Sequence, residues 1–240
     1  MMNIRAVAML ALLGAGYARG QFVWPKPEYH RHDPGVYRED PFITKYRAKF
    51  FAVFHGDFKT FEDAYKEIQG MVARDPRDAR ALVWLGNGQT IQAGLLLAGG
   101  KTAEGVALLK TSRQTMRRAV ALHPDDYGVY MMEAATLYVQ GQYWPDKYLP
   151  ASNWETLRDD CEKLIRALGP RIGQVSVHVR GETYGELGVA YAKLGDRTKA
   201  RRAFEKIVQN DPQSQYAEKA LKEIQKLDQQ GGVKTSSQGR

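Results

Sequence analysis

The sequence predicts an all-α fold: a solenoid of about four irregular αα-hairpins with a C-terminal capping helix. Apolar residues recur at helical spacing through most of residues 41–228, and this period marks helices with one buried face. Prolines that can end helices stand at Pro76, Pro124, Pro170 and Pro212, which are 48, 46 and 42 residues apart. A helix pair that recurs at such distances is typical of an array of stacked repeats.

The first two intervals each hold a pair of predicted helices. The first pair is a helix over 41–55 and a second helix that Pro76 ends. The second pair is a long helix over 82–98 and a helix over 102–122, separated by two glycines at 99–100. Glycine adopts the left-handed conformation that commonly ends a helix, so the chain is expected to turn sharply between them.

The third interval is predicted to hold helices over 129–140 and 154–168. Ser152 and Glu155 have the spacing of a capping box, which is expected to start the second of these helices. A closing helix over 217–227 has lysine and glutamate on its outer face. A polar outer face is what a terminal cap of a repeat array requires.

Residues 181–212 hold the clearest hairpin. Its first helix is expected to run from Ser176, because the strand-like alternation over 174–179 has no pairing partner. Gly195 is placed to end that helix, and a second helix follows at once. The pattern W-x2-L-G-x2-Y, A-x3-F and P is matched, with Tyr in place of Trp, by Tyr184, Leu187, Gly188, Tyr191, Ala200, Phe204 and Pro212.

This hairpin resembles the tetratricopeptide repeat (TPR), and the whole chain is similar to exported bacterial tetratricopeptide-like proteins. The wider resemblance rests on ALVWLGNG at 81–88, on residues 117–129 and on HVRGE at 178–182. The resemblance implies a TPR-like superhelix with a concave groove, lined mainly by the first helix of each repeat. Such grooves bind extended peptides or a partner's helix. The resemblance implies no particular activity.

The two ends of the chain are predicted to lie outside the repeat domain, which spans 41–228. Residues 1–20 carry a basic residue and an apolar run too short to cross a bilayer, which predicts a signal peptide cleaved before Arg19 or Gln21. A first helix of the fold and a retained anchor are the alternatives. Residues 21–40 are rich in proline and aromatics and are expected to be extended, and residues 229–240 are expected to be disordered. The protein is therefore predicted to be periplasmic or secreted.

Charge narrows the classes of partner. The chain has 35 basic and 27 acidic residues and a net charge of +8. This excess weakly favours an anionic envelope surface, and export argues against nucleic acid. Two helices carry basic clusters that are expected to be solvated or to touch such a surface: Lys110, Arg113, Arg117 and Arg118 on one, and Arg197, Lys199, Arg201, Arg202 and Lys206 on the other.

Motifs for catalysis or metal binding are few. Cys161 is the only cysteine, which excludes an internal disulfide, and its place in an apolar stripe predicts a buried thiol. The Gly-Gly-Lys-Thr at 99–102 lacks the first glycine and the preceding strand of a phosphate loop, so no cofactor is expected. His30, His32 and Asp33 are the best metal ligands in the sequence, but a folded site needs a further anchor. A solvated loop is therefore favoured there, and no metal site is predicted.

The partner-binding residues are expected among the polar and aromatic side chains of the first helices. Packing in the core is the alternative for each, and above all for Trp84. The aromatic segment 141–151 is expected either to fold back on the array as a plug or to form a binding lip. The partner-binding candidates are Trp84, Asn87, Gln89, Tyr130, Glu133, Tyr138, Tyr143, Trp144, Tyr148, Glu182, Glu186 and Lys193.

The sequence thus predicts a non-catalytic scaffold of the bacterial cell envelope that binds a partner protein or peptide in the repeat groove. After signal cleavage no stable membrane insertion is expected. Two alternatives stay open. One is a small-ligand-binding accessory of a transport complex, with the ligand under the segment 141–151. The other is an envelope enzyme or metal-binding protein that uses His30, His32 and Asp33.

Overall fold

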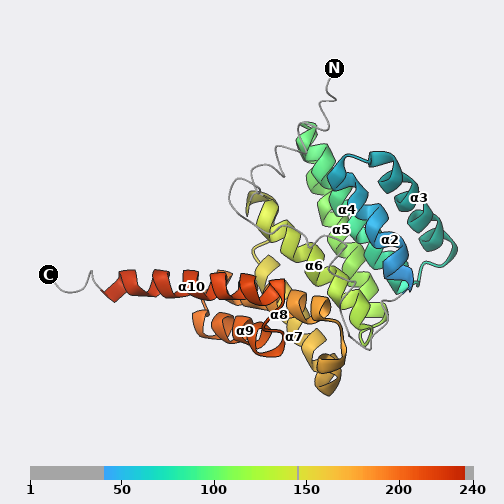
Figure 1. The fold of residues 1–240 in the computed structure, drawn as a ribbon. Coiled ribbons are helices and arrows are strands. Elements are labelled where there is room, and N and C mark those ends of the chain that lie inside the picture. The colour runs from blue at the N-terminus through green and yellow to red at the C-terminus, as the bar shows by residue number, and fades with distance from the viewer. Residues whose placement is uncertain (1–40, 145, 236–240) are drawn as a thin grey trace.

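The computed structural model describes residues 41–144 and 146–235, and this part of the chain is helical and holds no strand. The helices stack in chain order from α2 and α3 to α9 and α10 (Figure 1). The prediction of an all-α fold is confirmed. The α-helices are α2 (Pro41–Phe51), α3 (Phe58–Arg74), α4 (Ala79–Ala98), α5 (Thr102–Leu122), α6 (Tyr127–Tyr143), α7 (Asn153–Leu168), α8 (Val177–Lys193), α9 (Arg197–Asn210) and α10 (Gln215–Thr235), and the 3-10 helices are η2 (Ala52–His55), η3 (Asp146–Tyr148) and η4 (Gly169–Gln174).

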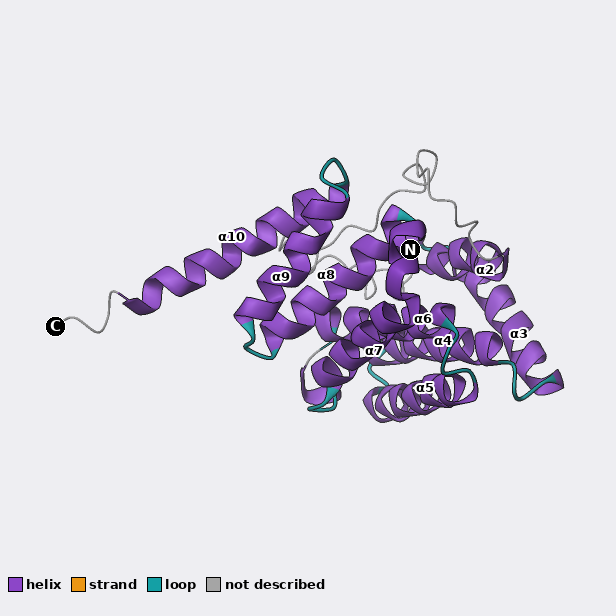
Figure 2. Ribbon diagram, turned by 90° about the horizontal axis from the view of Figure 1, so that it is seen from below, coloured by secondary structure: helices purple, strands orange, loops and turns teal. Residues whose placement is uncertain are grey.

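Consecutive helices pair into four hairpins, α2/α3, α4/α5, α6/α7 and α8/α9, and α10 packs against α8 and α9. Figure 2 shows the hairpins side by side, with α10 as the last layer. Helix α5 has the predicted bounds, and Gly100 ends the turn before it with φ +80°. The helical interpretation of the region after Ser176 is also correct, because the Ser176 side chain accepts a hydrogen bond from the backbone of Val179 and caps α8.

The second and third hairpins each start at an aspartate cap that closely follows a helix-ending proline. The Asp78 carboxylate accepts a hydrogen bond from the backbone of Ala81 at 2.9 Å, two residues after Pro76. After Pro124, Asp126 caps α6 in the same way. Proline cannot continue the preceding helix, and an aspartate side chain satisfies a free N–H group of the next one. Proline and cap together therefore fix where one hairpin ends and the next begins.

One predicted cap and one predicted boundary differ from the structure. Ser152 is the N-cap of α7, which begins at Asn153 as expected, but its side chain makes no cap hydrogen bond, because its backbone (φ −82°, ψ 11°) is not in the extended conformation that directs a capping hydroxyl at the first turn. The predicted disordered tail, 229–240, is helical as far as Thr235. Polar residues such as Gln229 and Gln230 have good helix propensity, so α10 continues past its packed part. Residues 236–240, like the predicted signal peptide and the segment 21–40, lie outside the described residues.

The core follows the stack and is built from large apolar side chains and a few glycines. Trp84 is 2% exposed, and its ring lies edge-on to Phe50 at 4.9 Å, so it packs in the core as the alternative interpretation held. Cys161 is buried, as predicted. In the last hairpin, a Cβ atom at Gly188 would lie 2.5 Å from the Phe204 ring. The glycine of the repeat pattern is therefore required by the close approach of α8 and α9.

Candidate functional site

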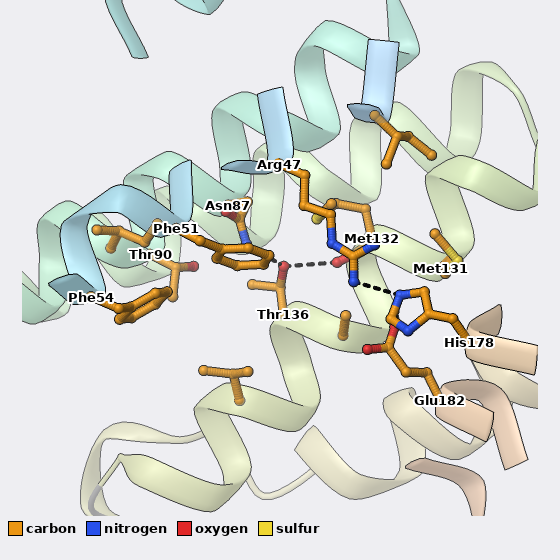
Figure 3. A pocket seen from close by; sticks show the side chains of 14 residues that line it. Arg47, Phe51, Phe54, Asn87, Thr90, Met131, Met132, Thr136, His178 and Glu182 are labelled. Carbon is orange, nitrogen blue, oxygen red and sulfur yellow. Dashed lines mark hydrogen bonds and ion pairs between the residues drawn. The ribbon is translucent and has the colours of Figure 1, made fainter. Parts of the chain in front are cut away.

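The first helices of the four hairpins together form one groove (Figure 3). Among the described residues no second helix contributes to its wall. The cavity volume is about 70 Å³, whereas pockets for drug-sized molecules have about 300–1,000 Å³. The groove therefore suits one or two side chains of a longer ligand. It is lined by Ile43, Arg47, Phe51, Phe54, Asn87, Thr90, Ile91, Met131, Met132, Ala135, Thr136, Val139, His178 and Glu182.

Helical periodicity explains which residues reach the groove. Helix α2 presents Ile43, Arg47 and Phe51 at intervals of four residues. Residues at this spacing share one face of a helix. In α6, Met132 and Val139 are seven residues apart, about two turns along one face. The wall is mostly apolar, and the flexible methionines can adapt to the shape of a bound chain.

The polar end of the groove joins the first hairpin to the fourth. Arg47 Nη2 of α2 lies 2.6 Å from His178 Nε2 of α8, although 131 residues separate them in sequence. The arginine can only donate, so Nε2 accepts. The ring proton is then on Nδ1, which lies 2.5 Å from the hydroxyl of Tyr216 on α10. A neutral histidine thus connects three helices of the stack.

One acidic side chain of α8, Glu182, stands beside this histidine, and a second, Glu186, is buried one turn further along the helix. Glu182 Oε2 lies 3.2 Å from His178 Nε2, and burial raises the pKa of Glu182 to about 7, although Arg47 and Lys219 act to lower it. Burial, and then the charge of Glu182, raise the pKa of Glu186 well above its ordinary value. Burial also lowers the pKa of Lys219. The polar end therefore holds groups whose charges respond to a ligand that displaces water.

Beneath the groove, a buried chain of hydrogen bonds ties the hairpins together. Gln140 of α6 donates to Thr90 of α4 at 2.9 Å, and Thr90 and Ser112 share a hydrogen bond of 2.7 Å. Arg113 of α5 donates to Gln140 and, at 3.1 Å, to Asn153 of α7. Burial lowers the pKa of Arg113 to about 10. A satisfied buried network fixes the packing of its elements, so it holds α4 and α6 in the relative position that shapes the groove.

A second buried cluster lies between α5, α6 and α7. Arg117 makes two contacts to Asp160, at 3.3 and 3.1 Å, and one to Glu133, at 3.1 Å. Burial, and then the charge of Asp160, raise the pKa of Glu133 to about 8. The other oxygen of Glu133 has no hydrogen-bond partner among the described residues. Burial also raises the pKa of Asp160, against the charges of Arg117 and Lys163 and the hydrogen bonds from Arg117. Of the two carboxyls, Glu133 has an oxygen without a partner and is the one that keeps a proton at neutral pH.

The structure brings only two of the sequence-predicted candidates, Asn87 and Glu182, to the groove. Asn87 donates to Thr136 at 2.9 Å across α4 and α6. The expectation that the other first-helix candidates face the groove is wrong, because those helices are covered on more than one side. Trp84, Tyr130, Glu133 and Glu186 are buried, Gln89 and Tyr138 are half-buried outside the groove, and Lys193 is exposed with its Nζ 5.5 Å from the Trp154 ring.

The aromatic segment 141–151 does not contribute to the groove lining either. Trp144 is half-buried, and its ring lies against α4 at Gly94, where a Cβ atom would be 3.6 Å away. Tyr148 is half-buried, with Lys147 Nζ 4.8 Å from its ring. The side chain of Tyr143 lies outside the described residues. The plug interpretation therefore fits Trp144 better than the lip.

Sequence reasoning missed the residues that form most of the groove. Arg47, Phe51, Met131, Met132 and His178 were absent from the candidates, although all five belong to first helices. It also expected Arg113 and Arg117 to be solvated. Both guanidinium groups instead bind buried acceptors, although the Arg117 side chain stays 42% exposed. The spacing of Ile43, Arg47 and Phe51 was the one available signal, and it does not say which helix lies opposite.

One comparison with known proteins agrees with a repeat in the last hairpin. Residues 181–214 match the family model of the tetratricopeptide repeat. No curated protein matches the sequence. A crystal structure of MamA is 19% identical in sequence to this chain, with a TM-score of 0.40. The match spans 84% of this chain and 99% of the MamA chain. A second MamA crystal structure is 18% identical, with a TM-score of 0.30, and the match spans 71% of this chain and 92% of that MamA chain.

The described helices were also compared with the requirements for crossing a membrane. None of them combines the length and the apolar character that a transmembrane helix needs. Nor do the described residues bring together three or more histidine, cysteine or acidic side chains that could hold a metal ion. The metal alternative, His30, His32 and Asp33, lies outside the described residues.

Proposed function

We propose that this all-α chain, which carries a tetratricopeptide repeat at residues 181–214, is a non-catalytic scaffold that binds an extended or helical segment of a partner protein. The binding site is the groove lined by α2, α4, α6 and α8. The scaffold works in the bacterial cell envelope, outside the cytoplasm. That location is supported by the signal-peptide pattern of residues 1–20.

This proposal rests on which helices form the groove and on which side chains line it. All four hairpins contribute to one mostly apolar wall with a few fixed polar groups, which are Arg47, Asn87, His178 and Glu182. A wall of this kind recognises apolar side chains and sets the direction of a peptide through a few hydrogen bonds. The cavity of about 70 Å³ favours a peptide over the alternative of a whole small ligand held in a pocket.

Selection from a displayed library of random peptides tests the proposal. The strongest peptides are then titrated against the wild type, Val139→Asp and Val106→Asp. Val139 lines the groove, whereas Val106 on α5 is 36% exposed and lies away from it. Burying an unpaired carboxylate in an apolar contact costs several kcal/mol, so Val139→Asp should weaken binding at least about tenfold.

Val106→Asp serves as the matched control and should leave the affinity unchanged. Circular dichroism spectra of both variants must match the wild type, so that a loss of binding reports on the groove. A library that yields no binding peptide, or peptides that bind both variants equally, would contradict a binding site in the groove.

A further inference from the structure

We propose that residues 21–40 of the same chain occupy the groove as its resident ligand and that a partner must displace them. This proposal rests on the proposed function of the groove as a peptide-binding site. It adds the identity of one occupant and a means of regulation, since the affinity for any partner then depends on competition with the chain's own segment.

The connection of the segment to the fold places it beside the groove. Residue 40 is bonded to Pro41, the first residue of α2, and Ile43 is already part of the groove wall. Twenty proline-rich residues in an extended conformation reach about 60 Å at roughly 3.1 Å per residue. Four helices packed about 10 Å apart span about 30 Å from first to last. The segment can therefore cross the whole groove from α2 to α8.

The chemistry of the segment matches that of the wall. Extended proline-rich segments dock in grooves lined by aromatic side chains, and Phe51 and Phe54 supply such side chains here, next to the adaptable Met131 and Met132. The segment has three basic and four acidic residues, so its net charge is close to zero. Its apolar and proline residues are Phe22, Val23, Trp24, Pro25, Pro27, Tyr29, Pro34, Val36 and Tyr37.

Tethering makes even a weak contact effective. A short linker gives an effective concentration of about 1 mM. A segment that would bind as a free peptide with a Kd of about 100 μM is then bound about nine-tenths of the time. A partner that competes for the same groove is weakened about tenfold. Replacing the aromatic residues of the segment should therefore raise the affinity of the groove for a partner about tenfold.

Paramagnetic relaxation in the mature chain, residues 21–240, tests where the segment lies. Gly35→Cys is labelled with a nitroxide, and the buried Cys161 does not take up the label in the folded protein. The methyl groups of methionine carry ¹³C. We expect the signals of Met131 and Met132 in the groove to broaden strongly, and that of Met71 on α3, which is not part of the groove lining, to broaden less.

A mixed sample shows whether the segment docks on its own chain or on a second copy. Labelled chains without ¹³C are mixed with unlabelled ¹³C chains. Broadening that occurs only when label and ¹³C share a chain supports the proposal. Broadening in the mixed sample as well as in the doubly labelled one means that the segment docks on a second copy and overturns the proposal, and absence of broadening in both samples overturns it as well.

A competition experiment separates this proposal from the proposed function. The selected peptides are titrated against the wild type and against a variant with Phe22, Trp24, Tyr29 and Tyr37 replaced by alanine. An affinity about tenfold higher in the variant supports the proposal, and equal affinities overturn it. If equal affinities come with groove-dependent binding, the groove remains a peptide site with another occupant. If no peptide binds, the proposed function fails.

Discussion

Replacing Glu133 by glutamine should change how the stability of the protein depends on pH. Glu133 is 1% exposed and shares Arg117 with Asp160, and its pKa in the fold is about 8 against an ordinary value of 4.5. Between those values the folded protein holds a proton that the unfolded chain has released. The free energy of unfolding therefore falls as the pH rises from about 4.5 to about 8 and is then constant.

The size of the effect follows from the pKa difference. One unit corresponds to about 1.4 kcal/mol, so raising the pH from 5.5 to 9 lowers the stability of the wild type by on the order of a few kcal/mol through Glu133. Glutamine cannot ionise and should lose nothing over this range. It leaves one amide N–H group unpaired, which costs about 1–3 kcal/mol at every pH. Glu133→Gln should thus be less stable than the wild type at pH 5.5 and more stable at pH 9.

Urea unfolding of both proteins at pH 5.5, 7 and 9 measures the difference. Glu182 and Glu186 titrate in the same direction, but they are present in both proteins and cancel. Glu104→Gln on α5, whose side chain is 62% exposed, is the matched control and should follow the wild type. Parallel curves for Glu133→Gln and the wild type would refute the reasoning, because Glu133 would then be ionised beside Arg117.

Two further predictions concern packing. Gly188→Ala should destabilise the protein by about 1–3 kcal/mol, because the added Cβ atom would lie 2.5 Å from the Phe204 ring. Gly185→Ala is the control and should leave the stability unchanged, because its added Cβ atom has its nearest contact at 3.8 Å. Urea unfolding of both variants measures the difference. Cys161 should react with a thiol reagent only in the unfolded protein, since burial raises the pKa of its thiol well above the ordinary value. Fast labelling of the native protein at neutral pH would contradict that placement.

The order of the helices could be predicted from the sequence because local chemistry sets it. Helix-ending prolines, the turn at Gly99 and Gly100, and the left-handed Gly195 (φ +84°) act within one or two turns of the chain. Their effect does not depend on what packs nearby. The start of α7 after Ser152 was also predicted correctly, but the capping hydrogen bond was not, since a capping box also needs an extended backbone at the cap.

The groove could not be predicted in the same way. Helix α6 is covered on several sides, so its apolar pattern does not show that Thr136 faces the groove while Glu133 faces Arg117. The contact of Arg47 with His178 joins residues 131 positions apart, and it depends on how far the superhelix turns over four hairpins. The periodicity of apolar residues within one helix does not indicate how far the superhelix rotates from hairpin to hairpin.

The most direct test of a peptide site in the groove is a ¹³C-methyl NMR titration of residues 21–240 with the strongest selected peptide. Met131 and Met132 line the groove, whereas Met71 and Met116 are not among its lining residues. We expect the first two signals to shift progressively to saturation while the other two stay in place. Saturable binding that moves Met71 or Met116 and leaves Met131 and Met132 unchanged would contradict the account.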